Sequence, residues 1–68
     1  MSDDRYTVTF TGAQTAEAHE TLTALAEEPC TLAEILDACD DYRVSATLRD
    51  AQGSVRGWAR AGREYRLA

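Results

Sequence analysis

The chain has 68 residues and a formal net charge of −5, with 44% hydrophobic and 28% charged residues. A chain of this length forms one small domain, and its apolar content excludes a protein that stays disordered for lack of a core. No apolar run approaches the roughly 18 residues that a membrane span needs, and the acidic start Met1-Ser2-Asp3-Asp4 is unlike a basic signal peptide. We therefore expect a single domain over residues 1–68, no membrane partner and a cytoplasmic location.

The first predicted element is a strand over residues 5–10, where apolar and polar residues alternate. Thr11-Gly12-Ala13-Gln14 then matches a capping box, in which side chains bond the free backbone amides at a helix start. This motif predicts a helix over residues 13–27, and Pro29 ends it.

A second capping box, Thr31-Leu32-Ala33-Glu34, precedes apolar residues at helical spacing. It predicts a helix over residues 32–39. Asp40-Asp41 breaks the apolar pattern and is expected to follow that helix.

Residues 42–52 fit two structures. Alternation along residues 42–49 favours a strand, whereas Val44, Leu48 and Ala51 have the spacing of one helical face, so both interpretations stay open.

The rest of the chain has the composition of a β-hairpin region. Asp50-Ala51-Gln52-Gly53 is typical of a hairpin turn, residues 54–60 alternate as in a strand, and Ala61-Gly62 makes a further turn into residues 64–67. The predicted fold is thus α+β: an N-terminal strand, two helices and a C-terminal antiparallel hairpin region. The expected core consists of Tyr6, Val8, Phe10, Leu22, Leu25, Leu32, Ile35, Leu36, Val44, Leu48, Val55 and Tyr65.

Residues suited to catalysis or metal binding are few. Cys30 and Cys39 lack the paired spacing of a zinc site, even together with His19, so we expect reduced, packed thiols, no metal and no cofactor. His19 is the only histidine and is predicted to lie exposed on a helix, and the glycines are too dispersed for a phosphate loop. We expect no enzyme.

The charges are divided unevenly along the chain. Residues 1–41 hold ten acidic residues and one arginine, a net charge of −9, whereas residues 42–68 hold six arginines and two acidic residues, a net charge of +4. Phosphate binding needs local positive charge, which only the C-terminal segment provides.

Strand pairing would collect the basic residues on one face. If residues 42–49 and 54–60 are paired strands, period-two alternation forms a basic face that includes one tryptophan. Its residues are Arg43, Ser45, Thr47, Arg49, Arg56, Trp58 and Arg60. Arginine suits phosphates, and an exposed tryptophan can stack on a base or clamp a partner's side chain. The alternative is that Trp58 is buried and the arginines pair with the acidic helices of the same or a neighbouring molecule.

Two segments carry a resemblance to a known family. The helix–turn–helix stretch over residues 22–36, with Pro29 in its turn and Thr31 at the next helix start, resembles winged helix-turn-helix regulators of the arsenical-repressor kind. Gly53-Ser54-Val55 and the ending over residues 62–67 are similar to that family's wing. The resemblance implies a DNA-recognition helix over residues 41–52. It places groove contacts at Arg43, Thr47 and Arg49, and wing contacts at Arg56, Arg60 and Arg63.

Two functions follow as hypotheses. The first is a small nucleic-acid-binding or transcription-accessory protein, with DNA or RNA as partner, using Arg43, Arg49, Arg56, Trp58, Arg60 and Arg63. The second is a protein-interaction module, either a homodimer in which the acidic half of one copy meets the basic half of another, or a receptor for an acidic protein.

Overall fold

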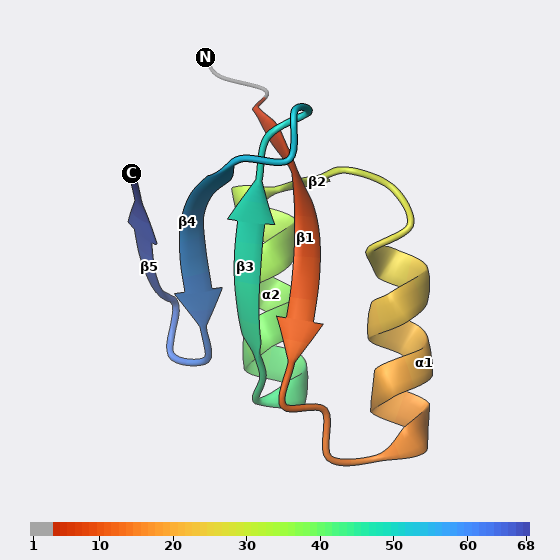
Figure 1. Ribbon diagram of the computed structural model, residues 1–68. Helices are drawn as coiled ribbons and strands as arrows, with labels where there is room; N and C mark the ends of the chain where they lie inside the picture. Colours follow the sequence, from red (N-terminus) through yellow and green to blue (C-terminus); the bar gives the residue numbers. More distant parts are fainter. Residues whose placement is uncertain (1–3) are drawn as a thin grey trace.

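The computed structural model describes residues 4–68, which form five strands and two helices. In chain order the elements are β1 (Arg5–Thr11), α1 (Ala16–Leu25), β2 (Cys30–Thr31), α2 (Leu32–Tyr42), β3 (Ser45–Arg49), β4 (Val55–Arg60) and β5 (Glu64–Leu67). The strands form one antiparallel sheet in the order β2-β1-β3-β4-β5, with α2 behind its middle and α1 beside β1 (Figure 1). The predicted α+β order is confirmed, and the short β2 between the helices is an addition to it.

Residues 42–52 form the last residue of α2, strand β3 and the following turn. β3 lies between β1 and β4, so its backbone groups are used on both edges. Long-range pairing therefore decides between the two local patterns in favour of the strand. The place that the winged-helix resemblance gives to a recognition helix is occupied by β3.

Helix α1 begins later than the sequence pattern predicted. Thr15 is its N-cap, with Oγ1 accepting a hydrogen bond of 3.0 Å from the Ala18 N–H. The expected capping box at Thr11 is wrong because Thr11 is the last residue of β1 and pairs with Ser45. The helix ends at Leu25, two residues short of the expected range.

Helix α2 has the predicted capping box. Thr31 Oγ1 accepts from the Glu34 N–H at 3.3 Å, and Glu34 Oε1 accepts from the Thr31 N–H at 2.9 Å. The helix continues through Asp40 and Asp41 to Tyr42, so the expected end at residue 39 is wrong. Contacts with the β4–β5 turn, described below, hold Asp40 in that last turn.

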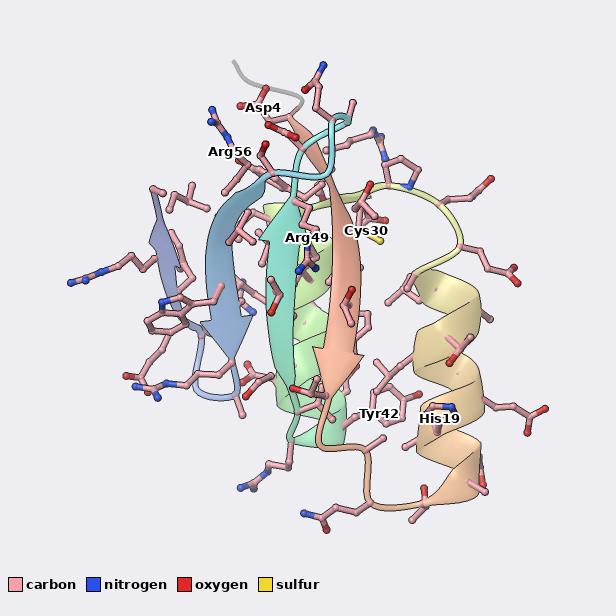
Figure 2. The ribbon with its side chains drawn as sticks, viewed as in Figure 1. Asp4, His19, Cys30, Tyr42, Arg49 and Arg56 are labelled. Atoms are coloured by element: carbon pink, nitrogen blue, oxygen red, sulfur yellow. The ribbon has the colours of Figure 1, made fainter. Side chains whose placement is uncertain are left out.

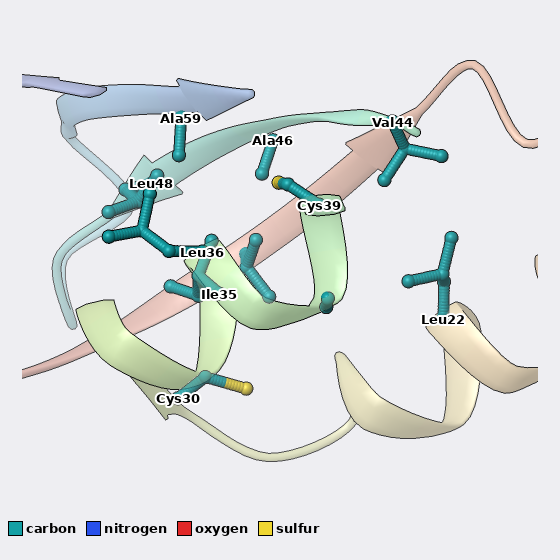
Figure 3. Packing of buried hydrophobic residues seen from close by; sticks show 11 residues of the cluster. Leu22, Cys30, Ile35, Leu36, Cys39, Val44, Ala46, Leu48 and Ala59 are labelled. Atoms are coloured by element: carbon teal, nitrogen blue, oxygen red, sulfur yellow. The ribbon is translucent and has the colours of Figure 1, made fainter. Parts of the chain in front are cut away.

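The core lies between α2 and the sheet, and Leu22 of α1 adds to it (Figure 3). Its buried residues are Val8, Leu22, Cys30, Ile35, Leu36, Ala38, Cys39, Val44, Ala46, Leu48 and Ala59. Of the predicted core residues, Tyr6, Phe10, Leu25 and Leu32 pack at its margin.

Two predicted core residues are instead exposed, Val55 at 56% and Tyr65 at 50%. Val55 is opposite Arg49 because a β-bulge shifts the register of β4 there. Tyr65 is on β5, at the outer edge of the sheet.

Candidate functional site

Within residues 4–68, the sheet has one face toward α2 and one face that no helix covers. Ala46, Leu48 and Ala59 are buried toward α2, so the residues alternating with them point to the opposite side. We call this side the open face. By register it carries Thr7, Thr9, Thr11, Ser45, Thr47, Arg49, Trp58, Arg60, Glu64 and Arg66.

Trp58 lies in a row of side chains that crosses four strands. Its register partners are Thr47 on β3 and Arg66 on β5, and Thr47 is in turn opposite Thr9 on β1. Trp58 keeps 39% of its surface exposed, so the indole is not a core side chain. The expectation that it could be buried is therefore not met.

Arg60 lies over the Trp58 ring. Its guanidinium carbon is 5.1 Å from the ring centroid, and its Nε is 3.3 Å from Glu64 Oε1. This cation–π contact and the ion pair hold a positive charge beside the exposed indole. Both side chains of the ion pair remain more than half exposed, at 54% and 60%.

Arg49 and Arg56 lie toward the other end of the open face. Arg56 Nε is 3.9 Å from Asp50 Oδ2, while Asp50 Oδ1 accepts hydrogen bonds from the Gln52 and Ser54 N–H groups of the turn. Arg49 lies in front of β3 and β1 in Figure 2. Across residues 4–68, the structure records no ion pair for Arg49.

Arg63 is drawn away from the open face toward α2. Its Nη1 is 2.8 Å from Asp37 Oδ1 and 3.9 Å from Asp40 Oδ2, and the hydrogen bond to Asp37 raises the pKa of Arg63. The Gly62 N–H donates to Asp40 Oδ1 at 2.6 Å. Arg63 therefore pairs with acidic residues of α2 in the same molecule.

Arg43 also lies outside this group. It ends α2 in the left-handed conformation, with φ 55°, and its N–H donates to the Cys39 carbonyl. Of the six residues predicted as a site, the structure thus places Arg49, Trp58 and Arg60 on the open face, with Arg56 at the bulge beside them.

Sequence reasoning missed Arg66, which lies directly opposite Trp58. The signal was present in the alternation of residues 64–67 after the Ala61-Gly62 turn. Pairing that segment with residues 57–60 would have put Arg66 beside the indole.

Most acidic side chains lie elsewhere. The two helices and the segment between them carry Glu17, Glu20, Glu27, Glu28, Glu34, Asp37, Asp40 and Asp41. Among the paired strand residues on the open face that the structure describes, Glu64 is the acidic one. The side of the molecule that carries the helices is therefore acidic, and the open face of the sheet is basic.

The two thiols are packed in the core. Cys30 and Cys39 are free and buried, and burial raises the pKa of both, to about 11 for Cys39. In the described part of the chain, no three His, Cys, Asp or Glu residues gather as metal ligands. None of the helices in residues 4–68 is long and apolar enough to cross a membrane.

A scan against protein-family models found no match to this chain, and searches of curated proteins and of solved structures found none either. The resemblance to winged helix-turn-helix regulators therefore stays a prediction, and the open face is interpreted from its residues alone.

Proposed function

We propose that the chain is a small non-enzymatic protein that binds single-stranded nucleic acid on the open face of its sheet. The observation that carries this proposal is the exposed Trp58 in the middle of the face, with Arg66 opposite it and Arg60 over its ring. An exposed indole offers a base a stacking surface worth about 1–3 kcal/mol, whatever the base.

The arginines on this face are available to phosphates. Arg49 and Arg66 have no ion pair within the described residues. The ion pairs of Arg56 and Arg60 are solvent-exposed, and such pairs are worth only about 0–1 kcal/mol. A phosphate can therefore replace the carboxylate at small cost. Arginine's fork of donors suits that replacement.

Threonine hydroxyls complete the surface. Thr9 and Thr47 lie in the same row as Trp58, and each hydroxyl can both donate and accept a hydrogen bond. Sugar oxygens and the edges of unstacked bases need such groups.

The acidic helices oppose this binding less than the net charge implies. They lie behind or beside the sheet (Figure 1), whereas the proposed ligand lies in front of it. Charges in solvent are largely screened beyond about 8–10 Å at physiological salt. A single strand is favoured over a duplex because its unstacked bases can stack on the exposed Trp58 ring.

Matched arginine variants test the proposal. We expect Arg66→Ala to weaken binding of a fluorescent oligothymidylate at low salt, whereas Arg43→Ala, an identical charge change at the end of α2, leaves it nearly unchanged. Trp58→Ala should also weaken binding because the stacking surface is lost. Fluorescence anisotropy measures all three. Equal losses in Arg66→Ala and Arg43→Ala would show that only net charge matters and would overturn the site.

Sedimentation in the same buffer distinguishes nucleic-acid binding from the alternative function, a homodimer of complementary halves. A homodimer held by complementary halves would show a mass that rises with concentration and falls with salt. Such a dimer without any oligonucleotide binding would replace the present proposal.

A further inference from the structure

One edge of the sheet is open beside α1. β2 pairs only with Arg5 and Tyr6, so in the described structure β1 from Thr7 to Thr11 has β3 on one side and no strand on the other. A groove of about 420 Å³ lies there. It is lined by Val8, Thr9, Phe10, Ala13, His19, Leu22, Thr23, Ala26 and Glu27.

The register identifies the backbone groups that face this groove. The Ala68 N–H donates to the Arg56 carbonyl at 2.7 Å, which fixes the phase of hydrogen bonding between β5 and β4. In an antiparallel sheet, successive residues point their backbone groups to alternate neighbours. The same alternation applies across β4 and β3 to β1. The backbone groups of Thr9 therefore point toward β3, whereas those of Val8 and Phe10 point toward the free edge.

Val8 and Phe10 thus present two N–H and two C=O groups to the groove. Among residues 4–68, these four backbone groups have no hydrogen-bond partner outside the sheet. Groups in this position favour a partner that supplies hydrogen bonds in the same pattern, which is a further strand.

The walls of the groove indicate which strand would fit. Leu22, Ala26 and Phe10 offer apolar contacts to alternate side chains of an extended chain. Glu27 is the charged carboxylate in the lining, and the lining contains no arginine. An extended segment with a basic residue near Glu27 is complementary to it.

We infer that this groove binds an extended, basic peptide segment of a partner protein, which adds to β1 as a strand between β1 and α1. The site is separate from the proposed nucleic-acid surface, because Trp58 lies on β4, two strands away. Main-chain bonds to Val8 and Phe10 would supply affinity, and the apolar wall and Glu27 would select the sequence.

A capped peptide of about seven residues, with alternating valine and threonine and arginine at both ends, serves as the probe. In ¹H–¹⁵N spectra of the full chain, we expect saturable shifts of the Val8 and Phe10 amides and slower hydrogen exchange at both. The same peptide N-methylated at alternate positions should lose these effects. A glutamate-ended version should bind about threefold more weakly, as an exposed charge pair implies.

Two tryptophan variants on α1 provide a matched control. Thr23 lines the groove and Thr21 does not, and both are exposed positions of the same helix. We expect Thr23→Trp to lower the affinity for the peptide about tenfold, because the indole fills the groove. The Thr21→Trp variant should bind the peptide with the affinity of the unsubstituted chain. Equal affinity of the two variants, shifts confined to other residues, or no saturation at millimolar peptide would each overturn the inference. Oligonucleotide binding should be unchanged in Thr23→Trp, which keeps the two proposals independent.

Discussion

Gly57 decides whether β5 can join the sheet. A side-chain carbon at this position would collide with the Arg66 carbonyl oxygen and would lie 3.0 Å from Leu67 Cδ2. Glycine is thus needed here for close approach of two strands, and Leu67 is placed across from it by register. This contact therefore fixes the position of Arg66, which is the arginine opposite Trp58 in the proposed site.

We expect Gly57→Ala to destabilise the chain by about 1–3 kcal/mol, as overpacking does. The loss should be concentrated in β5, because the colliding atoms belong to that strand. Denaturant unfolding measures the first effect, and hydrogen exchange of the Arg66 and Leu67 amides measures the second. An unchanged exchange pattern would mean that β5 does not pack on Gly57.

Single residues also show where sequence reasoning reaches its limit for the site. Alternation alone put Arg49, Trp58 and Arg60 on one face, because period two is a local property of any strand. Arg63 could not be assigned from the sequence, since its partners Asp37 and Asp40 lie far away in the chain.

Helix α2 is the element whose start depends most on local chemistry. Thr31 and Glu34 exchange hydrogen bonds within one turn. The Thr31 N–H and hydroxyl both donate to Glu34 Oε1, and these two bonds lower the pKa of the Glu34 carboxyl. A carboxyl with a lowered folded pKa adds stability above its unfolded pKa and loses it as pH falls through the folded value. The window therefore lies below the usual glutamate pKa of 4.5.

Thr31→Ala should cost about 1 kcal/mol at neutral pH, because the hydroxyl that accepts from the Glu34 N–H and donates to Glu34 Oε1 is lost. We expect Glu34→Gln to remove part of the acid-dependent loss of stability, and the double variant to be less damaging than the two single effects added together. Urea unfolding of the four proteins between pH 3 and 7 checks both points. Strict additivity, or an identical pH profile in Glu34→Gln, would show that the box does not form in solution.

The other elements could be predicted only as far as local patterns control them. The capping box at Thr31 was found because its bonds span three residues, whereas the similar pattern at Thr11 was misleading because β1 needs Thr11 for pairing with Ser45. Residues 42–52 fit both a strand, which their alternation favours, and a helix, and pairing with β1 and β4 selects the strand.

At the scale of the whole molecule, the fold converts a charge gradient along the chain into two unlike sides. The acidic residues of α1 and α2 lie behind and beside the sheet. Arg60 and Arg66 lie beside Trp58, and Arg49 and Arg56 lie toward the other end of the open face. A single net charge of −5 hides this arrangement. Local charge, and not net charge, governs the encounter with a polyanion.

Salt dependence of oligothymidylate binding, followed by Trp58 fluorescence, tests the central claim most directly. Trp58 is the only tryptophan, so its emission reports on the open face itself. We expect quenching on binding and an affinity that falls with salt by a logarithmic slope of about −0.7 for each phosphate contact, with Arg66→Ala removing about one contact. A folded chain whose Trp58 emission is unchanged by oligonucleotide at low salt would contradict the claim.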